Sequence, residues 1–301
     1  MPRESMYPKI SIVTPNFNGG AYLEQTIESV LSQKYPNLEY IIIDGGSTDE
    51  SISIIKKHES RLAYWVSEPD KGLYDAIQKG FDKSTGEIMA WINSDDLYHP
   101  KAFFTVAELF ELNGVNWLQG IPSVFDEMGR TVYVNPIKRW TKLDYYLGNF
   151  AWIQQESIFW RRSLWEVSGK KIATDMKYAG DLELWLRFFR HDKLFVTHAL
   201  LGGFRQRSKG QLSLNFLEQY KEEARAKIQD EITNNIPVAE RDLLKKIVAQ
   251  NSLIAKIRSV VLKKIISKVF YYPINKKRQV YFSYPSMIIF DRVAQKFKID
   301  K

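Results

Sequence analysis

The chain contains no cysteine among its 301 residues. This absence excludes disulfide bonds, thiolate metal ligands and cysteine nucleophiles, and it fits a reducing cytoplasm. No apolar run approaches the roughly 18 residues of a membrane-spanning helix, and the N-terminal residues hold no signal-like apolar stretch. We therefore expect a cytoplasmic protein, with the inner face of the cell membrane as a second location.

Two common phosphate-binding patterns are also missing. No P-loop sequence occurs, and no Gly-x-Gly-x-x-Gly follows an expected strand. Walker-type phosphate binding and hydride transfer from a dinucleotide are therefore poorly supported. The histidines do not have the spacing of zinc ligands; they are His58, His99, His191 and His198.

Acidic residues are scarce at the C-terminal end. Residues 251–301 hold 12 Lys and Arg against 2 Asp and Glu, a balance of +10, whereas the net charge of the whole chain is +8. The remainder of the chain is near neutral, at −2. This asymmetry indicates an anionic partner for the basic tail, either a membrane surface or nucleic acid.

Short apolar runs alternate with helical patterns through the first hundred residues. This alternation predicts an α/β fold with a mostly parallel sheet flanked by helices. Strands are expected at 9–14, 38–43, 62–66 and 88–92, and helices at 22–33, up to 57, at 74–81, 101–112 and 181–189. A loop is expected at 202–213, and the chain beyond 214 has a mainly helical pattern.

The most informative stretch follows the apolar run at 88–92. Asp95 and Asp96 come directly after it, with Asn93 beside them. Adjacent carboxylates repel each other and are costly to bury without a partner. At the carboxyl end of a parallel strand they would line the crevice where open sheets bind ligands, and a hard divalent cation would be their partner. The alternative is a solvated turn.

Two further strand ends carry polar loops, at 14–18 and 44–49. Because the carboxyl ends of parallel strands lie at one edge of a sheet, we expect these loops to meet the acidic pair there. Within the second loop, Ser47 or Thr48 is expected to cap the next helix, and Asp49 to stabilise its first turn.

The ordered set of motifs resembles the family 2 glycosyltransferases of GT-A (Rossmann-like) fold, in particular bacterial members that build surface polysaccharides. The resemblance covers residues 9–213. The matching stretches are SIVTPNFN at 11–18, IIIDGGSTD at 41–49, EPDKGLYDA at 68–76, NSDD at 93–96, QQES at 154–157 and GDLELWLR at 180–187.

This resemblance implies an inverting, metal-dependent transfer of a hexose or related sugar in polysaccharide biosynthesis. The donor would be a nucleoside-diphosphate sugar, with a UDP-sugar expected first and GDP or dTDP as alternatives. The acceptor would be a glycan or a lipid-linked glycan, and the cofactor Mn²⁺ or Mg²⁺. The resemblance also implies a nucleotide-sugar-binding part at about 8–100 and an acceptor part at about 101–213. The charge and the helical pattern predict a separate basic, mainly helical region at 214–301.

Residue roles follow from the same resemblance. Asp96 and Asp95 match the metal-binding motif, in which one carboxylate also contacts the ribose, and Asp181 matches the catalytic base. Many members carry two consecutive aspartates after the second strand, whereas this chain has Gly45 at the second position. The expected nucleotide-sugar site comprises Thr14, Pro15, Asn16, Asn18, Asp44, Gly45, Ser47, Lys71, Asp75, Asn93 and Asp95.

Several of these residues have plainer interpretations. Asp181 follows a glycine and would also serve as the N-cap of the helix that starts at 182. Lys71 would otherwise be a solvated loop lysine, and Asp75 would face either the pocket or solvent.

The expected acceptor residues are Gln154, Gln155, Glu156 and Arg205. Arg205 and Arg207 are also candidates to reach diphosphate oxygens.

The basic tail leaves two interpretations open. Its apolar residues recur at helical spacing, with lysines largely on the other side, so that a peripheral membrane helix within 243–301 and a helix packed on the catalytic part are both consistent with the pattern. The apolar residues are Leu243, Ile247, Ile254, Ile257, Val261 and Ile265.

Two other functions were weighed. A sugar-nucleotide nucleotidyltransferase should carry a basic, glycine-rich loop after the first strand, but residues 15–20 contain no basic residue. A non-enzymatic nucleic-acid-binding protein would use the tail, but the near-neutral remainder of the chain argues against it. We therefore expect no nucleic-acid partner.

Overall fold

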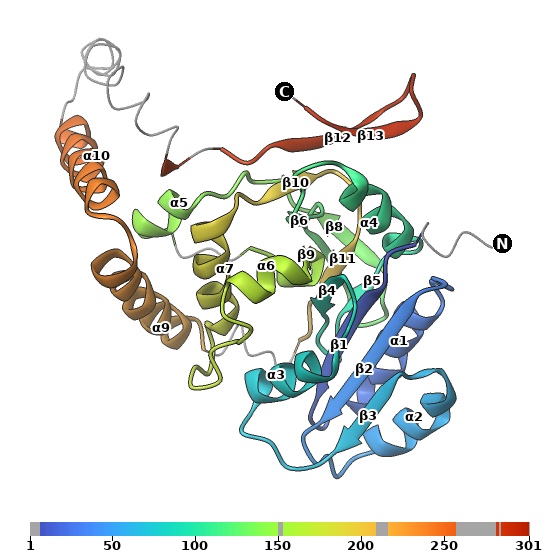
Figure 1. The fold of residues 1–301 in the computed structure, drawn as a ribbon. Helices are drawn as coiled ribbons and strands as arrows, with labels where there is room; N and C mark the ends of the chain where they lie inside the picture. The colour runs from blue at the N-terminus through green and yellow to red at the C-terminus, as the bar shows by residue number, and fades with distance from the viewer. Residues whose placement is uncertain (1–6, 150–152, 209–215, 257–280, 283, 301) are drawn as a thin grey trace.

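The computed structural model describes residues 7–149, 153–208, 216–256, 281, 282 and 284–300. Nine of the described strands form one large sheet, drawn in Figure 1. Its order is β13 (Lys296–Ile299), β12 (Met287–Asp291), β10 (Phe195–Thr197), β6 (Trp117–Gln119), β9 (Ile158–Arg161), β4 (Ile88–Trp91), β1 (Ile10–Asn16), β2 (Leu38–Asp44) and β3 (Tyr64–Ser67).

Most neighbouring strands in this sheet run parallel. The half formed by β4, β1, β2 and β3 is wholly parallel, as are the pairs of β10 with β6 and with β12. Strand β9 runs antiparallel to both β4 and β6, and β13 runs antiparallel to β12. The prediction of an α/β protein with a mostly parallel sheet is confirmed.

Helices cover both faces of the sheet. The chain steps outward from β1 to β3 through α1 (Gly20–Leu31) and α2 (Ser51–His58), and returns to β4 through α3 (Leu73–Lys83). Because such crossovers are right-handed, the reversal puts α3 on the face opposite α1 and α2 (Figure 1). The other α-helices are α4 (Ala102–Glu111), α5 (Lys142–Tyr146), α6 (Arg162–Val167), α7 (Gly180–His191), α9 (Leu217–Asp230) and α10 (Val238–Lys256).

A second sheet of four strands lies beside the first. It comprises β5 (Leu97–Tyr98), β11 (Gly202–Arg205), β7 (Ser123–Phe125) and β8 (Thr131–Val134). The expected loop at 202–213 is thus wrong in its first residues, because β11 pairs with β5 and β7. Residues 209–213 lie outside the described part of the chain.

The cap predicted at Ser47 or Thr48 is also wrong. The N-cap residue of α2 is Glu50, and its side chain forms no capping hydrogen bond. The Asp49 carboxylate instead accepts hydrogen bonds from the backbone N–H groups of Ser51 (3.0 Å) and Gly20 (2.9 Å). Asp49 therefore joins the starts of α1 and α2, while Ser47 serves the loop after β2.

The C-terminal region is helical only in part. It begins with α9 and α10, but β12 and β13 then extend the main sheet because β12 pairs with β10. Leu243 and Ile247 of α10 are buried in the core, which favours the packed-helix interpretation there. The other apolar tail residues fall outside the described side chains. No helix in the described residues is long and apolar enough to span a bilayer.

A cluster of buried tryptophans fixes α7 against the sheet. The Trp185 ring stacks on Trp91 of β4, with centroids 5.8 Å apart, and on Trp117 of β6, at 5.7 Å. Trp160 of β9 meets the same ring edge-on at 5.9 Å. All four side chains are buried, so three strands and the helix are held in one arrangement.

Candidate functional site

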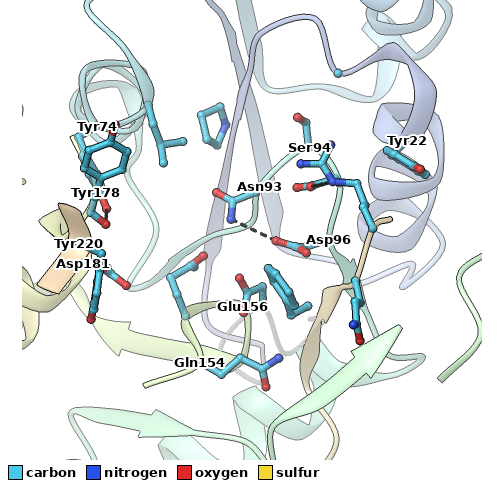
Figure 2. Close-up of a pocket in the computed structure, with 18 of the residues that line it drawn as sticks. Tyr22, Tyr74, Asn93, Ser94, Asp96, Gln154, Glu156, Tyr178, Asp181 and Tyr220 are labelled. Carbon is cyan, nitrogen blue, oxygen red and sulfur yellow. Dashed lines mark hydrogen bonds and ion pairs between the residues drawn. The ribbon is translucent and has the colours of Figure 1, made fainter. Parts of the chain in front are cut away.

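One large cleft opens along the polar edge of the main sheet. Its volume is about 1190 Å³, and both sheets, α3, α7 and α9 contribute to its lining. Following the strand order, the cleft passes Gln119 at the end of β6, the Gln154–Glu156 turn before β9, the acidic pair after β4, Asn16 at the end of β1 and Gly45 after β2. Figure 2 shows Asp181 across this cleft from Asn93 and Asp96.

Asp96 occupies the centre of the cleft. Its carboxylate accepts hydrogen bonds from the Asn93 side-chain amide (3.1 Å) and from the backbone N–H of Arg205 (2.7 Å). Burial raises the pKa of Asp96 well above its ordinary value, and the neighbouring carboxyls of Asp95 and Glu156 raise it further. An ionised carboxylate is therefore costly at this position unless a cation lies beside it.

Arginine already meets one of these carboxylates. The Arg207 Nε lies 3.0 Å from Asp95 Oδ2, and Arg207 lines the cleft. The pKa of Asp95 is raised by burial, against the opposing effect of Arg207. The Arg207 side chain thus pairs with the acidic loop at the surface of the cleft.

Arg205 has a different position. Its guanidinium contacts the carbonyl oxygens of Asp95 (2.5 Å) and Glu127 (2.8 Å) and the Gln25 side chain (3.0 Å). Arg205 is buried and does not line the cleft. Arg205 therefore stabilises the loop that carries the acidic pair. This position differs from the predicted one beside the acceptor or the diphosphate.

The cleft also presents amide oxygens that lack partners. Buried side-chain oxygens of Asn16, Asn93, Gln154 and Gln155 accept no hydrogen bond from the described residues, although each residue lines the cleft. Buried polar groups are nearly always satisfied in native proteins. These oxygens lie beneath the cleft surface, although the side chains that carry them contribute to the lining.

Gln119 is a cleft residue that the sequence analysis missed. Neither its amide oxygen nor its amide nitrogen has a partner among the described residues, and its side chain is buried. Gln119 is the last residue of a short strand, much as the acidic pair follows soon after the apolar strand β4. The same pattern would have identified it, but the strand is only three residues long.

Asp181 lies in the first turn of α7. The helix begins at Gly180 after Ala179, so the predicted N-cap role is wrong. Asp181 Oδ1 instead accepts a hydrogen bond from the N–H of Leu182 (2.8 Å). Burial raises the pKa of Asp181 to about 6, and the bond from Leu182 only partly offsets this effect.

A close approach between α3 and α7 shapes this end of the cleft. A Cβ atom at Gly180 would lie 2.8 Å from the Tyr74 ring, so a glycine is needed there. Tyr74 donates a hydrogen bond to the carbonyl of Tyr178 (3.1 Å) and lies beside Asp181 (Figure 2). The catalytic candidate is thereby enclosed by aromatic side chains.

Helix α9 completes the same end of the cleft. The Glu223 carboxylate accepts the backbone N–H groups of Lys177 (3.0 Å), Tyr178 (2.8 Å) and Ala179 (2.9 Å), just before α7. Tyr220, one turn earlier, lines the cleft near Asp181 (Figure 2). These two residues come from the predicted C-terminal region, which therefore shares the cleft with residues 1–213.

Glu156 lies between the two ends. It belongs to the turn that precedes β9, and its side chain is buried and faces Asp96. Burial raises the pKa of Glu156 to about 7. Its chemistry is thus coupled to the acidic pair.

The nucleotide half of the predicted site is arranged around Asp44. This buried carboxylate accepts hydrogen bonds from Asn16 (2.6 Å) and from the hydroxyls of Ser47 (2.6 Å) and Ser67 (2.6 Å). Burial opposes the charged form, but these hydrogen bonds outweigh it and lower the pKa of Asp44. Asp44 therefore joins the ends of β1, β2 and β3 behind the cleft surface.

The predicted site residues separate into two groups. Those that line the cleft are Pro15, Asn16, Asn18, Gly45, Asn93, Asp95, Asp96, Gln154, Gln155, Glu156 and Asp181. Those placed outside the lining are Thr14, Asp44, Ser47, Lys71, Asp75 and Arg205. In the second group, Thr14 bonds to the buried Tyr40 hydroxyl (3.0 Å), and Asp75 accepts the N–H of Lys71 (3.1 Å) at the start of α3.

A divalent cation fits the acidic pair if the ligand supplies further oxygens. No group of three or more His, Asp or Glu in the described residues is arranged to hold a metal. However, Mg²⁺ is commonly held by one or two carboxylates together with substrate phosphates. Asp95 and Asp96 provide that donor set, because an ionised carboxylate has about four acceptor positions and only some are used.

Comparison with known proteins decides the family. The model described as Glycosyl transferase family 2 matches residues 11–166. The chain belongs to this family. An uncharacterized glycosyltransferase of Rickettsia typhi is 25% identical over 228 residues, which cover 73% of this chain and 71% of the relative.

Solved glycosyltransferases share the fold. S. aureus TarS 1-349, in complex with UDP-GlcNAc, is 19% identical with a TM-score of 0.62, and the match covers 78% of this chain and 70% of TarS. The mannosyltransferase PcManGT of Pyrobaculum calidifontis, in complex with GDP-Man and Mn²⁺, is 17% identical with a TM-score of 0.59, and the match covers 93% and 86% of the two chains. The predicted GT-A architecture is thereby confirmed for this glycosyltransferase.

Proposed function

We propose that this glycosyltransferase moves a sugar, with inversion, from a nucleoside diphosphate to a glycan or lipid-linked glycan. The observation that carries the proposal is the position of Asp181, a partly buried carboxyl that lines the cleft across from Asp96. Its pKa of about 6 leaves it ionised at neutral pH yet close enough to neutrality to accept a proton.

The acidic side of the cleft would hold the leaving group. Asp95 and Asp96 would bind Mn²⁺ or Mg²⁺, which supplies positive charge to the departing diphosphate. Arg207, at 3.0 Å from Asp95, would contact phosphate oxygens of the same group. These residues would hold the diphosphate on one face of the sugar.

Asp181 would act on the opposite face. An inverting reaction requires the acceptor hydroxyl to attack the anomeric carbon from the side away from the diphosphate. Asp181 would accept the hydroxyl proton as the new glycosidic bond forms and the bond to the diphosphate breaks. Tyr74 and Tyr220 would exclude water around the carboxylate and provide apolar surface for the acceptor sugar.

Three glutamine side chains would recognise the sugars. Gln154, Gln155 and Gln119 lie on the β4–β6 half of the cleft, away from the nucleoside loops. Amide side chains that line a cleft suit the hydroxyl groups of the transferred sugar or of the acceptor. This placement supports a carbohydrate ligand on that half.

The test is a screen of purified protein with UDP-, GDP- and dTDP-sugars, each with Mn²⁺, with Mg²⁺ or with EDTA. We expect one nucleotide family to bind with cation present and to be slowly hydrolysed without acceptor. The absence of binding to every nucleotide sugar, with protein shown to be folded by circular dichroism, would overturn the proposal.

A peripheral membrane role for the tail is a second proposal. Residues 251–301 carry the +10 balance, and the β12–β13 hairpin exposes Val293 (97%) beside the exposed Arg292 and Lys296. The hairpin projects at the upper edge in Figure 1. Basic and apolar side chains together suit an anionic bilayer surface.

A further inference from the structure

Gly45 is a glycine for reasons of space. Its φ is not positive, so its backbone conformation does not require glycine. A Cβ atom at this position would instead lie 2.6 Å from Oδ2 of Asp70 and 3.1 Å from its Cγ, so that the Asp70 carboxyl would have to move to admit it. The carboxyl group of Asp70 therefore fills the volume that a side chain at position 45 would take.

Asp70 is held in this place by its own loop. Its Oδ1 accepts the N–H of Gly72 at 2.8 Å. Gly72 has a φ of 115°, which a glycine adopts without strain, and it begins α3. With Oδ1 engaged, Oδ2 faces the space over Gly45, and both residues line the cleft.

The strand order indicates which part of a ligand reaches Asp70. Strands β4, β1, β2 and β3 follow one another in the sheet, so Gly45 after β2 lies two strand spacings, about 10 Å, from the acidic pair after β4. The proposed diphosphate lies at the acidic pair, and the transferred sugar lies toward Asp181. The nucleoside must then extend the other way, past Asn16 to Gly45 and Asp70.

We propose that Asp70 recognises the nucleobase of the donor by a hydrogen bond, and that Gly45 leaves the space in which the Asp70 carboxylate lies. This inference rests on the proposed nucleoside-diphosphate donor. A carboxylate accepts hydrogen bonds only, so it pairs with the ring N–H of uracil, thymine or guanine. Cytosine and adenine present a ring nitrogen acceptor at that edge, and two facing acceptors repel.

Binding of UDP, GDP, CDP and ADP with Mn²⁺, measured by calorimetry, tests the idea. The unmodified protein should bind UDP or GDP at least tenfold more tightly than CDP and ADP. Asp70→Ala should weaken the preferred nucleotide about 10- to 100-fold, the range for a hydrogen bond to a charged group, and leave CDP unchanged. Asp70→Asn should move the preference toward CDP, because its amide donates to the cytosine ring nitrogen.

A paired exchange tests the geometry. Gly45→Asp alone should lose the preferred nucleotide, because its Cβ collides with Asp70. Combining Gly45→Asp with Asp70→Gly should recover a preference for the N–H-bearing bases, since one carboxylate again occupies the same space. Circular dichroism of each variant establishes that it is folded.

The outcomes separate the two proposals. If the unmodified protein binds none of the four diphosphates, the proposed function fails, and base reading by Asp70 fails with it. If it binds them and Asp70→Ala keeps the full base preference, only the role of Asp70 is refuted. A paired exchange that is folded but shows no recovered preference refutes the shared-space argument.

Discussion

Replacing Asp181 by asparagine should make this glycosyltransferase more stable and nearly inactive. The change keeps the shape of the side chain, and the asparagine oxygen can still accept the N–H of Leu182. Removal of a general base typically lowers turnover by 10²- to 10⁴-fold. The affinity for the nucleotide sugar should be almost unchanged, because Asp96, at the proposed diphosphate site, lies across the cleft from Asp181.

The stability gain follows from the raised pKa. The folded state shifts the pKa of Asp181 from its ordinary value of 3.8 to about 6, so the folded protein binds the proton more tightly than the unfolded chain. This preference stabilises the fold below about pH 4 and is lost as the pH rises through about 6, a change of about 3 kcal/mol. Asparagine is neutral throughout, so at pH 8 the variant should unfold at higher denaturant concentration.

The assay pairs kinetics with denaturation. For the unmodified enzyme, kcat/KM should fall about tenfold per pH unit below pH 6 as Asp181 becomes protonated, and urea titrations at pH 5 and pH 8 give the stability difference. A variant that keeps more than a tenth of the turnover would show that the base is elsewhere. A variant that is less stable than the parent at pH 8 would refute the burial argument.

Three further predictions concern the metal, the support of α7 and the tail. Asp96→Asn should abolish cation-dependent donor binding without loss of fold, whereas Asp175→Asn, at an exposed position, should leave donor binding unchanged. Equal donor affinity of the two variants with Mn²⁺ would contradict the assignment of Asp96 to the metal site. Glu223→Ala should lower kcat about 10- to 100-fold at constant donor affinity, because misplacement of a catalytic group is costly, and its exposed neighbour Glu222→Ala should be silent; a fall in affinity rather than kcat would contradict a positioning role. The double variant Arg292→Glu, Lys296→Glu should weaken co-sedimentation with phosphatidylserine vesicles by tenfold or more, since each basic residue near such a surface is worth about 1 kcal/mol. The control Lys56→Glu on α2 should leave co-sedimentation unchanged. These substitutions are preferable to removal of residues 251–301, because that removal would leave β10 without its neighbour β12.

The sequence by itself determined the parallel half of the sheet and the residues at its edge. Strands such as β4 have continuous apolar runs, and breakers bound them, so local periodicity suffices to place them. Polar residues directly after such a strand can only lie at its carboxyl end. This rule placed Asp95, Asp96 and Asn16 at one cleft before any tertiary contact was considered.

Short strands escaped the same reasoning. Three or four residues carry too little periodic signal, so β6, with Gln119 at its end, was not resolved, and β11 was assigned to a loop. The predicted cap at Asp181 failed for a related reason. An aspartate near a helix start suits several positions, and only the carboxylate of Glu223, 42 residues away, shows where the free N–H groups before α7 are satisfied.

Tertiary structure alone decided which polar residues face the cleft. Arg205 and Asp44 are as polar as Arg207 and Asn16, yet the former pair is engaged beneath the surface because long-range partners satisfy it. The same holds for Asp70 and Gly45, whose carboxyl group and missing side chain share one volume although 25 residues separate them. Sequence records residue types and local periods, whereas shared volume, burial and the pKa shifts that follow arise only when distant segments pack together.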